Sequence, residues 1–163
     1  MNHRLRSLLI ILAVVALDWS SKIYIRNHVG PADVVPVIPG FFNIVHAENP
    51  GAAFSMFAEA PSRTRSILLI GVSSAVMLIV GSMLWRNPSP AVVENPLLRL
   101  GLALVFGGAL GNLWDRAFRG TVTDFVQLFF GSYEFASFNV ADSAITVGTA
   151  LLILDLLMTR KKA

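Results

Sequence analysis

The sequence predicts an α-helical integral membrane protein with four transmembrane helices and a small extracytoplasmic β-sheet element. Of its 163 residues, 55% are hydrophobic and only 14% are charged, whereas a soluble domain carries about a quarter charged residues. The mean hydropathy is +0.66. Residues 66–85 form an uncharged run of about 20 residues, which is the length that crosses the hydrocarbon of a bilayer.

Shorter apolar runs predict the other three helices, because neighbouring apolar residues extend each of them. These runs are Ser7–Leu17, Leu100–Trp114 and Ala144–Leu154. We therefore expect one membrane-embedded domain over residues 1–163, with helices near 7–25, 66–85, 97–114 and 139–158. Charged residues near the helix ends are costly at membrane depth, which makes them candidates for function.

The first helix begins like a secretory signal peptide. Arg4 and Arg6 precede the apolar run, and Val14 and Ala16 are small enough for a cleavage site. The helical pattern continues beyond them through Asp18–Ile25, so we expect an uncleaved helix. Four spans place both termini on one side of the membrane, and the basic residues at the C-terminal end predict, by the positive-inside rule, that this side is cytoplasmic.

Two segments lie outside the bilayer, near residues 27–63 and 116–138. Five prolines interrupt the first segment, and Phe41–His46 has the composition of a strand, so we expect a small sheet on the membrane surface. The second segment is short and aromatic, which is typical of the membrane interface.

Successive transmembrane helices cross the membrane in opposite directions, so the polar residues near their ends on one side meet at one rim of the bundle. The rim holds Asp18, Asn49, Asn112, Asp115, Arg116, Asp124, Asn139 and Asp142. Two carboxylates in low-dielectric surroundings can share a proton, so that one accepts a proton from water while the other donates to a carbonyl or a leaving amine. Asp124 and Asp142 fit this description, but the residues alone do not decide between them and Asp18 or Asp115.

Several of these residues also have a structural explanation. Asp18 and Lys22 lie four residues apart and can pair on one helix face, and Asp115 and Arg116 can form an interfacial ion pair. Asn139 can be the N-cap of the last helix.

If Asn139 is the N-cap, Asp142 lies in the first turn of the last helix, where its negative charge interacts favourably with the helix dipole. Asp155, at the opposite end of that helix, is expected to be structural. The chain has no cysteine, and its three histidines are scattered, so we expect no metal site and no cofactor. A basic-aromatic stripe for nucleic acid is also missing from the sequence.

Five stretches resemble, in order and spacing, the motifs of the bacterial lipoprotein signal peptidase family (signal peptidase II, or prolipoprotein signal peptidase). They are Asp18–Lys22, Asn49–Phe54, Gly111–Arg116, Gly120–Phe125 and Phe138–Ile145. The resemblance implies a multi-pass aspartic endopeptidase of the bacterial inner membrane, with its active site near the outer face. Its substrates would be lipoprotein precursors whose cysteine carries diacylglycerol, cleaved on the amino side of that cysteine.

The resemblance also implies the roles of single residues. Asp124 and Asp142 would be the catalytic pair, and Asp18 and Lys22 would be structural supports. The residues that support or contact the substrate would be Asn49, Asn112, Asp115, Arg116 and Asn139. Trp114 stands where an aliphatic residue is commoner in the family. The implied partners are precursor substrates and membrane lipid, and the implied state is a monomer.

Two other functions are compatible with an acidic rim. One is a small membrane carrier or proton-linked channel that uses the rim as an ion path. Such a protein is expected to have polar groups through the depth of the membrane, and the sequence shows no inverted repeat. The other is a non-catalytic membrane chaperone or scaffold, in which conservative changes at the aspartates are harmless.

Overall fold

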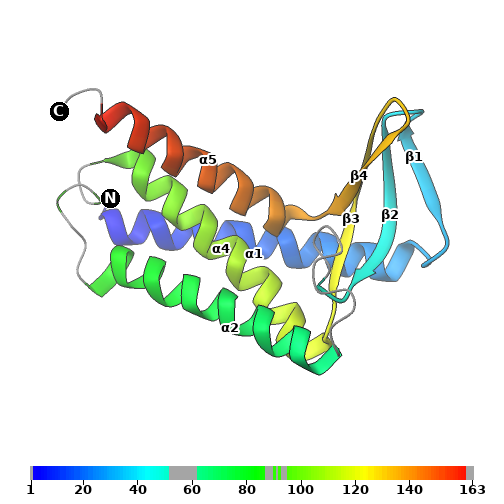
Figure 1. Ribbon diagram of the computed structural model, residues 1–163, viewed down its shortest axis with the longest axis horizontal. Coiled ribbons are helices and arrows are strands. Elements are labelled where there is room, and N and C mark those ends of the chain that lie inside the picture. The colour runs from blue at the N-terminus through cyan, green and yellow to red at the C-terminus, as the bar shows by residue number, and fades with distance from the viewer. Residues whose placement is uncertain (1, 52–61, 87–89, 91, 93–94, 161–163) are drawn as a thin grey trace.

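A computed structural model of the chain describes residues 2–51, 62–86, 90, 92 and 95–160. Long helices lie side by side, and a small sheet crosses one end of them, opposite both termini (Figure 1). The helices are α1 (His3–His28), α2 (Ser62–Gly81) with its π-helical continuation η2 (Ser82–Arg86), α4 (Pro96–Arg119) and α5 (Val140–Arg160).

Within the described residues, four helical stretches are long and apolar enough to cross a membrane, namely His3–His28, Thr64–Arg86, Pro96–Arg119 and Val140–Thr159. This confirms the predicted fold class. Two parts of the sequence-based interpretation lie outside the described residues: Ala52–Phe54 of the second motif, and Lys161 and Lys162 of the basic end.

Helix α4 is the central element of the bundle, and its ends are set by local sequence. Its N-cap Asn95 accepts hydrogen bonds from the backbone N–H groups of the first turn, and Pro96 occupies the first helical position, where its missing N–H costs nothing. The helix ends at Gly120, whose φ of 80° is left-handed and favours glycine. The chain then enters the sheet directly.

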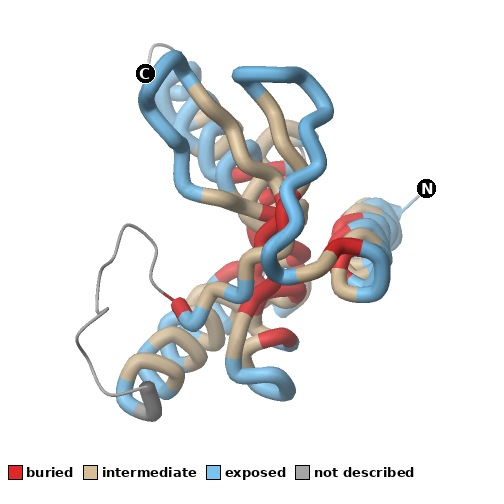
Figure 2. The backbone as a smooth tube through the Cα atoms, turned by 90° about the vertical axis from the view of Figure 1, so that its right-hand side faces the viewer, coloured by how far each residue is buried: buried red, intermediate tan, exposed pale blue. Residues whose placement is uncertain are grey.

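Small residues let α1 and α5 approach α4 closely near the sheet. A Cβ atom on Gly111 would lie 2.6 Å from a carboxylate oxygen of Asp18, so a larger residue there would displace that side chain. Figure 2, which views the molecule from the sheet side, shows the buried segments in its centre. The junction of β3 with α1, α4 and the start of α5 holds the buried polar residues Asp18, Lys22, Asn112, Asp115, Asp124 and Asn139. This junction, rather than the middle of the bundle, is where the polar residues of the rim are enclosed.

The sheet is antiparallel, with strand order β1-β2-β3-β4. Its strands are β1 (Val34–Ile38), β2 (Phe42–Asn49), β3 (Val122–Phe130) and β4 (Tyr133–Phe138). A strand near Phe41–His46 was expected, and β2 confirms it. The two strands of the second outer segment were not predicted, because aromatic residues suit both the membrane interface and a strand.

The pairing of β2 with β3 contains a bulge that sets the register beside the candidate site. Ile44 pairs with Val126 but Ala47 pairs with Asp124, so β2 has one more residue than β3 over this interval. Beyond the bulge, Glu48 lies opposite Thr123. The end of β2 is thereby aligned with the first residues of β3.

Candidate active site

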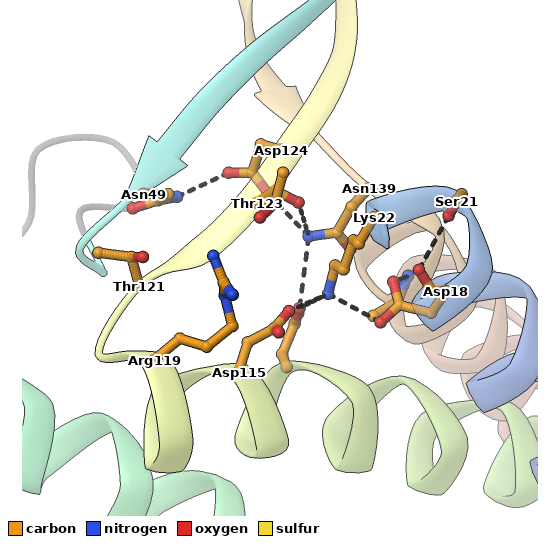
Figure 3. A network of polar contacts seen from close by, with 12 residues as sticks. Asp18, Ser21, Lys22, Asn49, Asp115, Arg119, Thr121, Thr123, Asp124 and Asn139 are labelled. Carbon is orange, nitrogen blue, oxygen red and sulfur yellow. Dashed lines mark hydrogen bonds and ion pairs between the residues drawn. The ribbon is translucent and has the colours of Figure 1, made fainter. Parts of the chain in front are cut away.

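The candidate site lies between the sheet and the ends of α1, α4 and α5, where polar side chains point toward one another (Figure 3). Asp124 is the third residue of β3 and is 3% exposed. Asp142 lies in the first turn of α5 and is half-buried. Both carboxylates line one cavity, although they are 18 residues apart in the sequence.

Two asparagine side chains hold Asp124. The Nδ2 group of Asn49 donates to one carboxylate oxygen at 2.9 Å, and Nδ2 of Asn139 donates to the other at 2.7 Å. Asn49 comes from the end of β2 and Asn139 from the start of α5. The carboxylate is therefore oriented by neutral donors from two separate elements.

Asp142 is held in a similar way. Nδ2 of Asn112 donates to its Oδ1 at 2.7 Å, and the backbone N–H of Asn139 donates to its Oδ2 at 3.2 Å. In return, Oδ1 of Asn139 accepts from the backbone N–H of Asp142 at 2.9 Å. This reciprocal cap confirms that Asn139 begins the last helix. The capping role and a role in the site therefore coexist in the same residue.

Asn139 links the two aspartates. Its side chain is fully buried, and its Nδ2 group lies within 3.4 Å of Oδ1 of Asp124, Oδ1 of Asn112 and the carbonyl oxygen of Thr123. Since its Oδ1 and backbone bind Asp142, one residue fixes both carboxylates relative to each other.

A second cluster lies next to the first and contains a cation. The Nζ group of Lys22 is 2.7 Å from Asp18, 2.9 Å from Asp115 and 3.0 Å from Oδ1 of Asn112. The three charged side chains are at most 3% exposed. The predicted pair between Asp18 and Lys22 is thus confirmed.

The suggested pair between Asp115 and Arg116 is not how these side chains are arranged. Asp115 forms its ion pairs with Lys22 and, at 3.8 Å, with Arg26, because neighbouring residues of a helix point in different directions. Arg116 lines the cavity with Asp124 and Asp142, and its charge interacts with both and more weakly with Asp115. Its buried Nε atom has no hydrogen-bond partner among the described residues.

The cavity beside the aspartates has a volume of about 530 Å³. Its walls are largely apolar side chains of β3, β4 and α5, and among its polar lining residues are Asn49, Arg116, Asp124 and Asp142. A mainly apolar hollow with a few convergent polar groups is the usual form of a binding site.

The protonation of Asp124 is strongly affected by its surroundings. Burial raises the pKa of its carboxyl, and the charge of Asp142 acts in the same direction. Hydrogen bonds from Asn49 and Asn139 and the charge of Lys22 oppose this rise, but the pKa still reaches about 6 instead of 3.8. Asp124 can therefore both hold and release a proton near neutral pH, as general acid–base chemistry requires.

Sequence reasoning missed the residues that hold the start of β3. Thr123 is fully buried, and its hydroxyl bonds to Arg26 at 3.2 Å and to Glu48 at 2.9 Å. The available signal was the alternation of the threonines Thr121 and Thr123 with the apolar Val122 after a helix-ending glycine, which is compatible with a strand.

Comparisons with known proteins show the family of the chain and agree with its fold. The chain matches the family described as signal peptidase (SPase) II over residues 10–158. It is 41% identical to a lipoprotein signal peptidase of Solibacter usitatus over 92% of this chain and 89% of that protein. It is 38% identical to one of Desulforapulum autotrophicum over 98% of each chain.

Two solved structures share the fold of this chain. A bacterial membrane enzyme structure determined at 2.3 Å by the in meso method superposes with a TM-score of 0.84 at 29% identity, over 96% of this chain and 90% of that one. A second such structure, at 1.9 Å, gives 0.80 at 30% identity, over 93% and 92%. With four apolar helices, a matching sheet and a family match over nearly its whole length, the chain belongs to the signal peptidase II family of multi-pass bacterial inner-membrane proteases.

Proposed function

We propose that this chain is an aspartic endopeptidase that acts as a single membrane-embedded domain. It removes the signal peptide from diacylglyceryl-modified lipoprotein precursors by cleavage on the amino side of the lipidated cysteine. The observation that carries the proposal is the pair Asp124 and Asp142, joined through Asn139 at the wall of a mainly apolar cavity. Relatives that carry the name lipoprotein signal peptidase supply the substrate class.

We assign the role of proton donor to Asp124, because burial raises the pKa of its carboxyl to about 6. Asp142 accepts a proton from a water molecule as the water oxygen bonds to the carbonyl carbon, and Asp124 gives its proton to the carbonyl oxygen. The resulting tetrahedral intermediate collapses when Asp142 passes its new proton to the leaving amine and Asp124 regains its own. The pair ends in its starting state, so the net reaction consumes one water and one peptide bond.

The surrounding residues orient the pair. Lys22 donates to Oδ1 of Asn112 at 3.0 Å, which leaves Nδ2 of that amide directed at Asp142. The guanidinium of Arg116 lies at the same cavity wall. It can orient the substrate carbonyl or a neighbouring carboxylate by charge-assisted hydrogen bonds.

The cavity suits a substrate held in the membrane. Apolar side chains of β4 and α5 line it together with the aspartates, so an apolar signal peptide can pack there while the lipid keeps the scissile bond at the depth of the pair. Such positioning is a major source of catalytic power. The protein would act as a monomer, without metal or cofactor, with membrane lipid as its other partner.

The decisive experiment compares a lipidated with an unlipidated precursor peptide, using purified protein. Cleavage of only the lipidated peptide, at the amino side of its cysteine, is the expected result. Equal cleavage of both peptides would contradict the substrate assignment. A carrier or channel would instead move protons or solutes across vesicles without cleaving either peptide. That alternative is disfavoured because the two aspartate clusters are joined through Asn112 and adjoin the sheet at β3.

The proposed orientation places the sheet outside and both termini in the cytoplasm. Single cysteines can test it cleanly, because the chain has none of its own. A cysteine at exposed Asp33, beside the sheet, should react with an impermeant reagent added outside the inner membrane, and one at exposed Pro90 should not. The opposite labelling pattern would invert the topology.

A further inference from the structure

We infer that Glu48 is a positioning residue for the proposed reaction, because it fixes the segment of β3 that carries Asp124. The inference rests on the proposed function of the aspartate pair. Glu48 belongs to none of the groups that surround the carboxylates directly. It lies on the opposite face of the β2–β3 ladder, and its effect on Asp124 is transmitted through Thr121 and Thr123.

The register of the β2–β3 pairing places Glu48 and Asp124 on opposite faces of the sheet. Glu48 pairs with Thr123, while the adjacent Ala47 pairs with Asp124. Since successive side chains of a strand point to opposite faces, Thr123 and Glu48 share one face and Asp124 lies on the other. The cavity is lined from the face of Asp124, so a residue on the Glu48 face can hold the strand without touching substrate.

The carboxylate of Glu48 collects hydrogen bonds from both strands. Thr121 donates to Oε2, and Thr123 donates to Oε1 at 2.9 Å. His46 contacts Oε1 through Nε2 at 3.1 Å, and Nδ1 of the same ring lies 2.8 Å from the carbonyl oxygen of Val29, the C-cap of α1. Glu48 thus joins the first residues of β3 to β2 and to the end of α1.

Thr123 passes this restraint to the helices and to the candidate site. Its hydroxyl accepts a hydrogen bond from Arg26 of α1 at 3.2 Å, and its carbonyl oxygen accepts from the Asn139 amide that also holds Asp124. Asp124 is the next residue along the strand. A misplacement of a reacting group by about 1 Å can cost on the order of 10²-fold in rate, so even a partial loosening of Thr123 should be measurable.

Glu48 keeps this acceptor role while Asp124 titrates. Burial alone would raise the pKa of Glu48, but the hydrogen bonds from Thr121, Thr123 and His46 and the charge of Arg119 outweigh burial and lower it. The guanidinium of Arg119 is 3.9 Å away and 42% exposed. Such an exposed pair contributes little, so the two threonine hydroxyls are the important donors.

The test measures kcat and KM for a lipidated precursor peptide in four variants. Glu48→Ala should lower kcat about 10-fold and leave KM within about twofold, because the strand loses its acceptor but the cavity keeps its lining. Glu48→Gln keeps one acceptor oxygen and replaces the other by an NH2 group, which can donate to a threonine hydroxyl. This variant should therefore restore most of kcat. Thr123→Val removes the Thr123 bonds to Glu48 and Arg26 at nearly constant shape and leaves the Thr121 bond. It should lower kcat in the same way as Glu48→Ala, and the loss in the double variant should be smaller than the two single losses combined.

Glu134→Ala is the matched control, since the carboxylate of this exposed glutamate of β4 accepts from Gln127 at 2.7 Å and has no other hydrogen bond among the described side-chain contacts. Its kcat should equal that of wild type. Unchanged kcat in both Glu48→Ala and Thr123→Val would overturn the inference, as would a loss confined to KM or a Glu48→Gln variant as slow as Glu48→Ala. Asp124→Asn, assayed in the same experiment, distinguishes failure of this inference from failure of the proposed mechanism. If it is inactive while the Glu48 and Thr123 variants are normal, only this inference fails, and if it is fully active, the proposed mechanism fails as well.

Discussion

Two pairs of aspartates lie in one polar network, but they are held by different kinds of donors. Asp18 and Asp115 share the ammonium of Lys22, at 2.7 and 2.9 Å. Asp124 and Asp142 accept hydrogen bonds from side-chain and backbone amides. Arg116 adds a nearby positive charge but forms no ion pair with them within 4 Å among the described contacts.

The difference determines what each pair can do. A single ammonium between two buried carboxylates offsets one of their two charges and holds both in place. Removing that ammonium would leave buried carboxylates without their main partner, at a large cost in stability. Amides hold a carboxylate in place without compensating its charge, so a proton can still be gained or lost there. The bridged pair is therefore suited to support, and the amide-held pair to proton transfer.

The largest expected effect comes from removing a proton site in the amide-held pair. Asp124→Asn and Asp142→Asn are nearly isosteric and should leave insertion and packing intact. Each should lower kcat by several orders of magnitude, because acid–base assistance alone contributes roughly 10²–10⁴-fold. The double variant should be little worse than either single one, since the pair acts as a unit.

Asp155→Asn is the control for these two variants. Asp155 lies near the other end of α5, where it accepts a hydrogen bond from Asn95, and asparagine can still accept that bond. Its turnover of a lipidated precursor should be that of wild type. Near-normal turnover by well-folded Asp124→Asn or Asp142→Asn protein would show that this pair is not catalytic.

Arg116→Lys tests whether the cation beside the amide-held pair needs its planar shape. Lysine keeps the charge but loses the forked set of donors. We expect the fold to be retained and kcat to fall roughly 10- to 100-fold, which corresponds to a charged hydrogen bond of about 1.5–3 kcal/mol. Arg119→Lys, on an exposed guanidinium at the end of the same helix, is the comparison variant. Full activity of Arg116→Lys would make that residue peripheral.

Asn49→Leu should shift the pH profile of kcat/KM and leave the fold intact. The Asn49 amide bonds to Asp124 and lowers its pKa, so an apolar residue of similar size should raise that pKa above about 6. If loss of the Asp124 proton inactivates the enzyme, the alkaline limb of kcat/KM, which reports the free enzyme, should move to higher pH. A limb that stays in place or moves to lower pH would contradict the role assigned to Asp124.

Much of this arrangement could be predicted from the sequence, but not all of it. The helices follow from apolar runs, and the pair Asp18–Lys22 follows from helical spacing. The pairing of β2 with β3 depends on a bulge and joins residues about 75 positions apart, which no local pattern specifies. Glu48 therefore escaped notice, and so did the choice of Lys22 over Arg116 as the partner of Asp115. The motif resemblance singled out Asp124 and Asp142, whereas the chemistry of the residues alone left Asp18 and Asp115 open.

The smallest expected effect on turnover is also the sharpest test of the comparison. Asp18→Asn replaces one carboxylate of the bridged pair, while its remaining oxygen can still accept from the backbone N–H of Ala141, as Oδ1 of Asp18 does at 2.9 Å. Lys22 keeps Asp115 as a partner, so the free energy of unfolding should fall by about 3 kcal/mol or less, and the thermal midpoint in detergent should drop. The folded fraction should keep kcat within about threefold of wild type, because the donors to Asp124 and Asp142 are untouched. Asp33→Asn, an exposed aspartate that accepts from the backbone N–H of Gly30, should change neither quantity. A folded Asp18→Asn enzyme as slow as Asp124→Asn would show that the two pairs act together in catalysis, and the division between support and proton transfer would then be wrong.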